Sequence, residues 1–255
     1  MKISVCMATF NGGKYLRKQI YSILKQLSVN DELIISDDGS TDETIEIIKS
    51  FIDCRVLLLH HVKDNNLEKV KHSHYLVSSN FENALKHVKG DFIFLSDQDD
   101  IWVDNKVEVM VPYLRKYSLV MSNCFVINDD DVIVRESFFS LCKLPRGLLL
   151  NISKPIYHGC CIAFTKKVLE EALPFPKKLI LHDSWLGVVA ESFGKVKFID
   201  DQLMFYRRHN ENASALEGKS TNSTLFKIRY RVVFFFQLIK KIFQIKFQIL
   251  PVTKQ

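Results

Sequence analysis

Short apolar runs alternate with amphipathic helical patterns through the first hundred residues. Apolar runs of strand length lie at residues 3–7, 33–35, 55–59 and 92–95. Between them, apolar side chains recur at helical spacing over residues 16–27 and 45–51, where Ser40 or Thr41 is expected to cap the second helix. Ser79 and Glu82 match a capping box, which predicts a third helix that begins there and ends at Gly90. This alternation predicts an α/β fold around a mostly parallel sheet.

Polar loops follow three of these four strands at their carboxyl ends. Asn11 follows the first strand, Asp37 and Asp38 follow the second, and the sequence Asp-Gln-Asp-Asp at residues 97–100 follows the fourth. Ligands of parallel sheets bind in the crevice outside the carboxyl ends of the strands, so we expect these side chains to meet there. The alternative is that Gly and Asp occupy these loops only because turns favour them.

The carboxylates of Asp97, Asp99 and Asp100 are crowded on one turn. Like charges at this spacing raise one another's pKa values, whereas a divalent cation with a phosphate-bearing ligand would hold all three ionised. The alternative for this cluster alone is a solvated acidic turn.

Length, composition and cysteine usage narrow the class of protein. The 255 residues are 47% hydrophobic and 11% aromatic, which is enough for one α/β domain or two small ones. The six cysteines form no C-x-x-C pair, which favours reduced core thiols over zinc or disulfides, and the adjacent Cys160 and Cys161 are expected on opposite faces of a strand. A strand begins at once and no leader peptide precedes it, so we expect a cytoplasmic protein.

Three motifs occur in order, and together they resemble one known family. They are Ala8-Thr9-Phe10-Asn11-Gly12, Asp37-Asp38-Gly39-Ser40-Thr41-Asp42 and Leu95-Ser96-Asp97-Gln98-Asp99-Asp100-Ile101-Trp102. Over roughly residues 2–212 the chain resembles the family 2 glycosyltransferases, which have the GT-A fold. The resemblance implies an inverting transfer of a sugar from a nucleotide diphosphate to an acceptor hydroxyl, assisted by Mg²⁺ or Mn²⁺.

A fourth motif, His182-Asp183-Ser184-Trp185, narrows the resemblance to a bacterial branch that is called rhamnosyltransferase-like. It implies dTDP-rhamnose as the first donor to test and a UDP-sugar otherwise. The implied acceptor is a saccharide, lipid-linked, in the synthesis of a bacterial surface polysaccharide.

The resemblance also implies roles for individual donor-side residues. Thr9 and Asn11 would lie against the base, and Asp38 would pair with the pyrimidine ring. Asp97 and Asp99 would bind the donor, with Asp99 facing the ribose, and the metal ligands would be Asp99, Asp100 and His209.

Further along the chain, the resemblance implies that His158 and Gly159 pass close to the donor sugar and that Arg207 supports the departing diphosphate. A core histidine beside a strand glycine is the alternative for the first pair. Asp183 is implied as the general base that takes the acceptor's proton. Its alternative is an acidic residue that stabilises a helix N-terminus.

The second half of the predicted domain is expected to bind the acceptor. Strands are predicted at residues 120–127 and 156–164, and the acidic turn at 128–131 is expected to be a solvated hairpin. We predict one domain over residues 1–215, with a nucleotide-sugar half at 1–103 and an acceptor half at 104–215. Residues 216–255 are predicted to form a separate tail.

The net charge of +6 is unevenly distributed, because eight basic residues and no acidic one follow Glu217. Aromatic and aliphatic residues recur among these charges, but no apolar run is long enough to cross a bilayer. The pattern predicts an amphipathic helix on the inner face of the cytoplasmic membrane. The alternatives are packing on its own domain or on a second copy in a homodimer. No nucleic-acid partner is expected.

Two other classes of function compete with the glycosyltransferase interpretation. A metal-dependent phosphoryl or nucleotidyl transferase could use the same acidic loops, but the chain contains no G-x-x-x-x-G-K-[ST] phosphate loop. A non-catalytic membrane-docking module could use the basic tail. The complete set of donor-side carboxylates and Asp183 count against that module.

Overall fold

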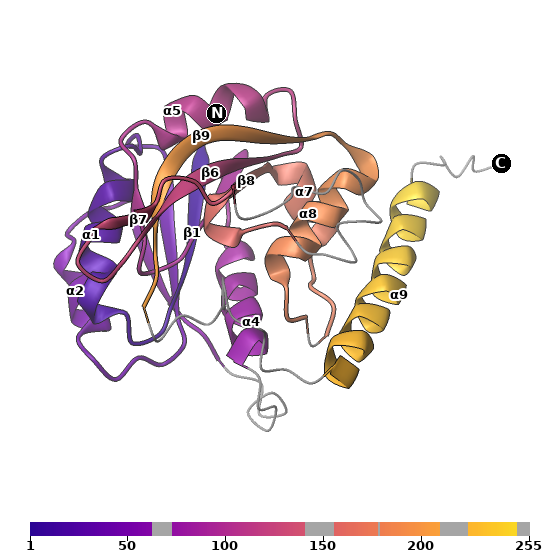
Figure 1. Cartoon of the computed structure of the whole chain (residues 1–255), viewed down its shortest axis with the longest axis horizontal. Helices are drawn as coiled ribbons and strands as arrows, with labels where there is room; N and C mark the ends of the chain where they lie inside the picture. Colours follow the sequence, from indigo (N-terminus) through magenta and orange to yellow (C-terminus); the bar gives the residue numbers. More distant parts are fainter. Residues whose placement is uncertain (63–72, 141–155, 178, 210–223, 249–255) are drawn as a thin grey trace.

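A mixed sheet runs through the whole described part of the protein (Figure 1). The computed structural model describes residues 1–62, 73–140, 156–177, 179–209 and 224–248. The strands are β1 (Ile3–Thr9), β2 (Glu32–Asp37), β3 (Val56–His60), β4 (Phe92–Ser96), β5 (Ile101–Trp102), β6 (Leu119–Ile127), β7 (Ile133–Arg135), β8 (Ile162–Thr165) and β9 (Val196–Arg207). The helices are α1 (Gly13–Leu24), α2 (Thr44–Ser50), α4 (Ser73–Leu85), α5 (Lys106–Leu114), α7 (Lys166–Ala172), α8 (His182–Phe193) and α9 (Thr224–Gln248).

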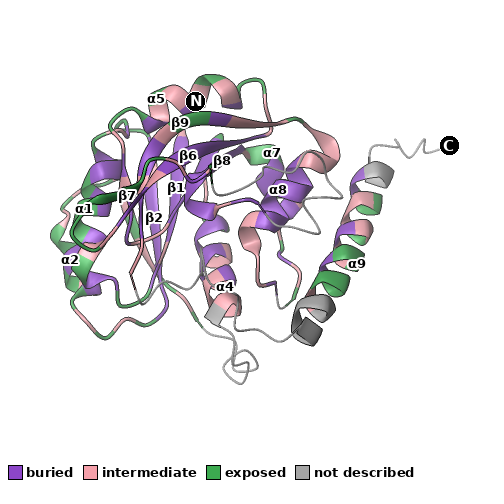
Figure 2. Ribbon diagram, in the orientation of Figure 1, coloured by how far each residue is buried: buried purple, intermediate pink, exposed green. Residues whose placement is uncertain are grey.

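The first half of the sheet is parallel, in the order β3-β2-β1-β4. These strands are short apolar runs because helices cover the sheet, and Val5, Ile34 and Phe94 are fully buried. Figure 2 shows this buried centre, with exposed residues on the outer sides of α1 and α2. Since β1 pairs with both β2 and β4, the polar loops at the carboxyl ends of these three strands lie next to one another. The three loops therefore share one edge of the sheet, which is where the sequence predicted that their side chains would meet.

The second half of the sheet is mixed and continues the first without a break. β8 is antiparallel to both β4 and β6, β9 is parallel to β6, and β5 is antiparallel to β9. α4 packs on β1 and β2, whereas α5 packs on β6, β8 and β9. This confirms the predicted α/β fold with a central sheet and flanking helices.

Two predicted helix starts are wrong, because tertiary partners take the side chains that were expected to cap them. Ser79 lies inside α4, and its hydroxyl meets His61 Nε2 at 2.9 Å. Glu82 Oε1 accepts from the Phe175 N–H at 3.0 Å. The second helix begins at Thr44 rather than after Thr41, because Ser40 instead accepts the Asn11 N–H at 2.9 Å.

The predicted strand over residues 156–164 is only partly present. Residues Gly159–Cys161 form a 3₁₀ turn, and β8 begins at Ile162. Cys160 and Cys161 therefore do not alternate across a strand, and both are fully buried on the turn. Successive side chains on a 3₁₀ turn lie about 120° apart, so the two thiols need not point to opposite faces as the strand prediction required.

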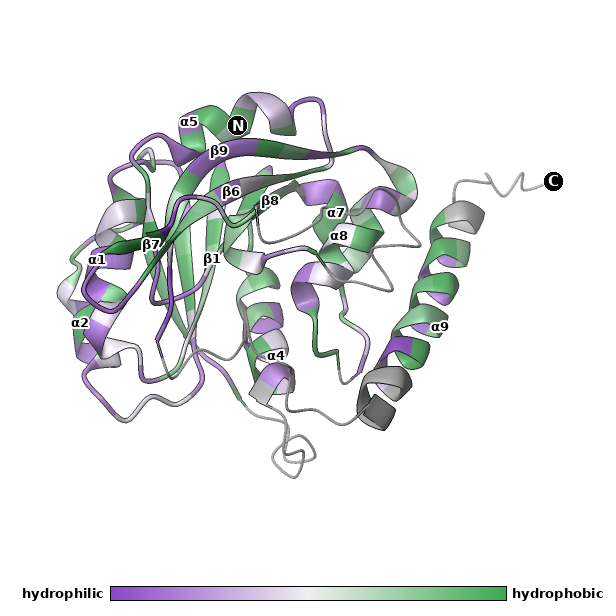
Figure 3. Cartoon of the chain, in the orientation of Figure 1, coloured by the Kyte–Doolittle hydropathy of each residue, from purple (hydrophilic) through white to green (hydrophobic). Residues whose placement is uncertain are grey.

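The C-terminal helix α9 packs on the domain through one face. Phe234 and Leu238 are buried, and the ring of Phe234 meets Trp185 of α8 edge-on at 5.8 Å. Lys241 Nζ lies 3.7 Å from a carboxylate oxygen of Glu171 in α7. Apolar and polar residues alternate along α9 (Figure 3), and no helix among the described residues has the length and apolarity needed to cross a membrane. The predicted boundary between residues 215 and 216 lies outside the described residues.

Candidate active site

The loop after β1 is held against the loop after β4 by one glutamine. Gln98 Oε1 accepts the Phe10 N–H at 2.8 Å, and its Nε2 donates to the Phe10 carbonyl at 3.1 Å. A Cβ atom on Gly12 would lie 2.4 Å from Gln98 Oε1, so this position has no room for a side chain. Gln98 thus fixes the distance between the polar loop after β1 and the polar loop after β4.

The two aspartates at the end of β2 have different roles. Asp37 organises the turn, because its Oδ2 accepts the N–H groups of Gly39 and Ser40 at 2.9 Å each. Gly39 has a φ of 82°, which only glycine adopts readily. Asp38 instead reaches His61, with 2.6 Å between Asp38 Oδ1 and His61 Nδ1. Asp38, which the resemblance assigned to the pyrimidine ring of the nucleotide, is thus not the aspartate that builds the turn.

Thr9 and Asn11 border the same turn. Thr9 is buried, and its hydroxyl donates to a carboxylate oxygen of Asp37 at 3.1 Å. Asn11 has a positive φ of 48°, and its Oδ1 accepts the Thr41 N–H at 2.8 Å. These contacts stabilise the turn. They also hold Thr9 and Asn11 close to Asp38, at the loop that is predicted to bind the base of the nucleotide.

The acidic loop after β4 brings two carboxylates and a thiol together. Ligand atoms of Asp97, Asp100 and Cys160 all lie within 4.8 Å of one another. Asp100 Oδ1 accepts the Arg207 N–H at 2.9 Å. Asp100 Oδ2 is buried and has no hydrogen-bond partner within the described part of the chain. A buried carboxylate oxygen without a donor is costly, and a cation would remove that cost.

Burial and mutual repulsion perturb these carboxyl groups. Burial, together with the charges of Asp99 and Asp183, raises the pKa of Asp97 to about 7. Burial and the charges of Asp99 and Asp97 raise the pKa of Asp100 well above its ordinary value. Nearby, the fully buried Lys106 donates from Nζ to the Cys160 carbonyl at 2.7 Å. The site therefore favours protonated acids unless further positive charge enters it.

Asp99 and His209, two of the three predicted metal ligands, contact each other directly. Asp99 Oδ2 lies 2.8 Å from His209 Nε2, and both side chains are largely buried. The ring of Tyr15 lies 5.2 Å from the His209 ring and covers it. One carboxylate oxygen and one imidazole nitrogen therefore meet beside Asp100, a donor set that suits Mn²⁺ or Mg²⁺ with additional water.

Arg207 is directed toward the β6–β7 hairpin rather than into open space. Its Nε donates to the Asp99 carbonyl at 2.9 Å, and its Nη1 donates to the Asn128 carbonyl at 2.9 Å. Its Nη2 pairs with Asp131, and its guanidinium lies over the Tyr15 ring. The hairpin at residues 128–131 is confirmed, but its acidic cluster is not simply solvated. The predicted contact of Arg207 with a diphosphate stays a prediction.

The second half of the chain, which is predicted to bind the acceptor, meets the acidic loop through the turn before β8. A Cβ atom on Gly159 would lie 3.4 Å from His182 Nε2 and 3.7 Å from the Asp183 Cβ, so the backbone there passes directly beside the start of α8. Asp183 lies in the first turn of α8, where its Oδ1 accepts the Ser184 N–H at 2.6 Å. Its charge acts on Asp97, so the predicted base faces the acidic loop.

His158 and His182 are both enclosed by aromatic rings. His158 stacks on Phe138 at 4.7 Å and meets Tyr206 edge-on at 4.5 Å. His182 stacks on Phe81 at 4.4 Å, and burial lowers its pKa. Both histidines thus belong to the wall of the site, and His182 is neutral at physiological pH.

Four residues of the site were missed by sequence reasoning: Tyr15, His61, Gln98 and Lys106. Gln98 lies inside the acidic motif, and only its two-way pairing with Phe10 reveals its role. No feature of the sequence indicated that Lys106 would be buried at the site, because a lysine at the start of a helix is ordinarily solvated. His61 followed the third strand directly, so its position at the same sheet edge was the one available clue.

Comparison with known proteins gives one family. The model of the family described as "Glycosyl transferase family 2" matches residues 4–173. Among curated relatives, a protein named UDP-Glc:alpha-D-GlcNAc-diphosphoundecaprenol beta-1,3-glucosyltransferase WfgD, from Escherichia coli, is 28% identical over 74% of this chain and 70% of its own length. The dTDP-rhamnosyl transferase RfbG of Shigella flexneri is 27% identical over 81% of this chain and 72% of its own length.

Solved structures resemble the chain in fold. Staphylococcus aureus TarS 1-349 in complex with UDP-GlcNAc superposes with a TM-score of 0.67 at 17% identity, over 92% of this chain and 66% of that one. The mannosyltransferase PcManGT from Pyrobaculum calidifontis, in complex with GDP-Man and Mn²⁺, gives a TM-score of 0.59 at 20% identity, over 83% of this chain and 58% of that one. The chain thus spans about two thirds or less of these solved proteins.

Proposed function

Since the chain belongs to glycosyl transferase family 2, we propose that it moves a sugar from a nucleotide diphosphate to a saccharide acceptor with inversion at the anomeric carbon. The observation that carries this proposal is the meeting of Asp38, the acidic loop of Asp97, Asp99 and Asp100, and Asp183 at one edge of a GT-A sheet. In this proposal the nucleotide needs Asp38, the leaving diphosphate needs the acidic loop, and the acceptor hydroxyl needs Asp183.

The proposed donor is dTDP-rhamnose, with a UDP-sugar as the competing candidate. A relative named as a dTDP-rhamnosyl transferase supports dTDP-rhamnose, and a relative named for UDP-Glc supports a UDP-sugar. Asp38, with Thr9 and Asn11 beside it, would take the pyrimidine base. Asp99 would take the ribose, Asp97 would also belong to the donor-binding site, and His158 and Gly159 would line the side of the sugar.

The residues present fit a hard divalent cation at the acidic loop. The buried, unpartnered Oδ2 of Asp100 and the Asp99–His209 pair offer oxygen and nitrogen donors, and the raised pKa values of Asp97 and Asp100 mark negative charge that lacks compensation. When bound, Mn²⁺ or Mg²⁺ supplies Lewis-acid stabilisation of the departing diphosphate. Solved neighbours such as the mannosyltransferase contain Mn²⁺, which supports this class of ion.

Asp183 is proposed as the general base. Inversion requires the acceptor oxygen to attack from the side opposite the diphosphate, and its proton has to leave to a carboxylate within reach. Asp183 begins α8 on the acceptor half, beside Gly159 and across from Asp97. The proton would move from the acceptor hydroxyl to the free carboxylate oxygen of Asp183 as the new glycosidic bond forms.

The proposed acceptor is lipid-linked, and α9 is proposed to hold the enzyme on the inner face of the cytoplasmic membrane. One relative is named for a diphosphoundecaprenol-linked acceptor. On α9, the side that does not pack on α8 exposes Val232, Val233, Phe236 and Phe243, with Arg231 and Lys240 also exposed. Apolar groups next to basic ones suit an anionic lipid surface.

Calorimetry of nucleotide diphosphate binding tests the donor proposal. With dTDP and UDP, Mn²⁺ should tighten binding to the wild-type chain, and Asp100→Asn should abolish that tightening while the circular dichroism spectrum stays unchanged. Asp104→Asn is the matched control, because Asp104 is exposed and pairs only with Lys25 among the described residues. Equal metal dependence in Asp100→Asn and the wild type would contradict the proposed cation site.

Product analysis separates the glycosyltransferase from the nucleotidyl transferase alternative. A glycosyltransferase that is given a nucleotide sugar releases the nucleoside diphosphate, whereas a nucleotidyl or phosphoryl transferase cleaves within the diphosphate and releases a nucleoside monophosphate or a sugar phosphate. We expect nucleoside diphosphate alone. Release of sugar phosphate would overturn the proposed function.

A further inference from the structure

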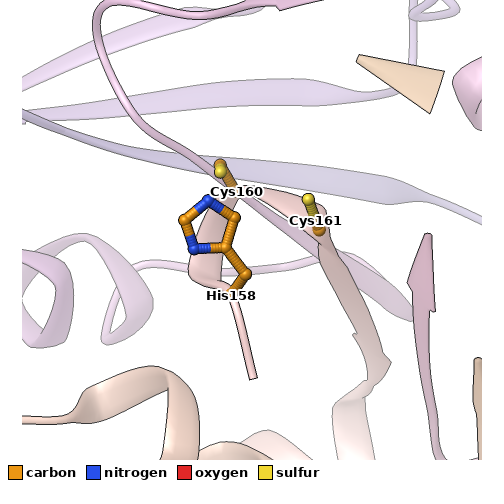
Figure 4. A group of neighbouring side chains, drawn as sticks. All are labelled: His158, Cys160 and Cys161. Carbon is orange, nitrogen blue, oxygen red and sulfur yellow. The ribbon is translucent and has the colours of Figure 1, made fainter. Parts of the chain in front are cut away.

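A histidine and two cysteines converge on the 3₁₀ turn before β8. Ligand atoms of His158, Cys160 and Cys161 all lie within 4.8 Å of one another. Figure 4 shows a ring nitrogen of His158 turned toward the Cys160 sulfur, with the Cys161 sulfur beside them. The turn is responsible for this arrangement, since an extended strand would send the two neighbouring thiols to opposite sides.

The three side chains are closely packed, and one of their ligand atoms is unsatisfied, although the Cys161 thiol donates to Met204 Sδ at 3.6 Å. Cys160 and Cys161 are fully buried, and the imidazole of His158 is fixed between Phe138 and Tyr206. His158 Nε2 is buried and has no hydrogen-bond partner among the described residues. A buried ring nitrogen that lacks a partner carries a desolvation cost, which a metal ion would remove.

The donor set and its spacing match a soft divalent cation. Thiolate sulfur and imidazole nitrogen are the preferred ligands of Zn²⁺, at about 2.3 and 2.0–2.1 Å, so ligand atoms around a tetrahedral ion lie roughly 3.5–3.8 Å apart. The observed limit of 4.8 Å needs only a small contraction. The Cys124 thiol contacts that of Cys161, so it could supply a third sulfur and a fourth ligand. Mg²⁺ does not favour such a set, because it prefers oxygen.

We propose that His158, Cys160, Cys161 and Cys124 bind one Zn²⁺-class ion. This site is chemically distinct from the oxygen-rich site of the acidic loop. On binding, the ion forms bonds to the ring nitrogen and to the thiolates, and the thiol protons pass to solvent.

The soft site and the acidic loop share one residue. Cys160 also lies within 4.8 Å of the ligand atoms of Asp97 and Asp100. An ion bound to the Cys160 thiolate would bring positive charge close to those carboxylates. Occupancy of the soft site is therefore expected to inhibit catalysis at the acidic loop.

Cobalt spectroscopy of the full-length chain tests the soft site without reference to activity. One equivalent of Co²⁺ should produce thiolate-to-metal charge-transfer absorption, and one equivalent of Zn²⁺ should remove it. Cys161→Ser and His158→Asn should each weaken Zn²⁺ affinity by more than about 100-fold, since even the outer partners of metal ligands are worth 10–100-fold. Cys54→Ser, which changes an exposed cysteine outside the cluster, should leave the affinity unchanged.

The proposal is wrong if Co²⁺ gives no thiolate bands or if Cys161→Ser binds Zn²⁺ as tightly as the wild type. Should a cluster variant fail to fold, X-ray absorption at the zinc edge of the wild-type chain decides instead. Two or three sulfur neighbours at about 2.3 Å support the site, whereas oxygen and nitrogen alone overturn it.

The inhibitory consequence rests on the proposed glycosyl transfer and needs a separate readout. In the presence of excess Mn²⁺, adding up to one equivalent of Zn²⁺ per protein chain should lower the turnover rate. A zinc-selective chelator should then restore that rate. If cobalt spectroscopy succeeds and no sugar is transferred at all, the proposed function fails and the soft site stands. If transfer is seen but Zn²⁺ binds without inhibiting it, the coupling through Cys160 is wrong.

Discussion

The aspartates at the carboxyl edge of the sheet have similar neighbours in sequence but different hydrogen-bond partners in the structure. Asp37 accepts two backbone N–H groups and stabilises a turn, whereas Asp38 faces His61. Asp99 faces His209, and Asp100 keeps one buried oxygen without a partner among the described residues. A carboxylate that backbone donors satisfy gains little from a cation. The proposed metal ligands are therefore Asp99 and Asp100 rather than Asp37.

The raised pKa of Asp97 predicts how stability responds to pH. The folded state holds this proton up to about pH 7, whereas the unfolded chain releases it near the ordinary value of 3.8. The folded state therefore binds more protons between these values, so the contribution of Asp97 to stability is full below pH 3.8 and is lost as the pH rises through about 7. In metal-free protein at pH 8, Asp97→Asn should raise the melting temperature.

The matching measurement is a melting series from pH 5 to pH 8 with and without Mn²⁺. The difference between Asp97→Asn and the wild type should grow with pH in the metal-free series and should shrink when Mn²⁺ is added. A difference that is independent of pH would show that Asp97 keeps its ordinary titration, and the electrostatic description of the loop would then be wrong.

Asp183→Asn tests the base while preserving its structural contact. The amide oxygen can still accept the Ser184 N–H, so the start of α8 should remain intact. Without a carboxylate to take the acceptor's proton, turnover should fall by roughly 10²–10⁴-fold. Donor affinity, measured by calorimetry, should change no more than a few-fold. Asp104→Asn serves as the control, and loss of donor binding in Asp183→Asn would assign the residue to the donor side instead.

At the scale of elements, the four strands of the parallel half could be predicted, whereas β9 and two of the helix starts could not. Runs such as residues 33–35 and 92–95 are continuously apolar because helices cover the sheet, so their identity as buried strands needs no long-range information. The positions of Ser79 and Ser40 depend on His61 and Asn11, which lie far from them in sequence. The same limit explains why Asp183 could be proposed from its motif, whereas the buried position of Lys106 could not be predicted.

The β6–β7 hairpin is a second case in which distant contacts decide a role. Its acidic turn meets α1 through Tyr15 and Lys18, and it meets β9 through Arg207. The hairpin thus connects the second half of the sheet to α1 in the first half of the chain. Sequence alone could show the turn but not these partners.

Arg207→Met tests whether this guanidinium is structural. The substitution leaves the carbonyls of Asp99 and Asn128 without their donor, and it should lower the free energy of unfolding by on the order of 2 kcal/mol. Arg208→Met is the neighbouring control and should stay within about 0.5 kcal/mol. Urea unfolding measures both. Unchanged stability together with weakened donor binding would instead support the contact of Arg207 with the diphosphate.

At the scale of the whole molecule, one sheet joins the two halves and α9 adds a surface of different chemistry. β9 pairs with β6 and with β5, so residues from both halves share a continuous core. α9 reaches that core through Phe234 and Leu238, while Phe236 and Phe243 remain exposed on it. Deleting the helix would uncover Trp185 as well as remove the exposed face. Point substitutions on α9 are therefore the better test of membrane binding.

Replacing Phe236 and Phe243 with Ser, and separately Arg231 and Lys240 with Gln, should release the protein from vesicles that contain anionic lipid. Each basic residue near such a surface contributes about 1 kcal/mol, so the second pair should weaken binding by about 30-fold at low salt. This effect should fade as salt screens the charges, whereas the effect of the Phe pair should persist. Leu238→Ala is the control, because it should cost about 2–5 kcal/mol of stability without touching the exposed face. If the Phe pair leaves vesicle binding unchanged and converts a dimer into a monomer, α9 is a subunit interface, and the proposed membrane attachment is wrong.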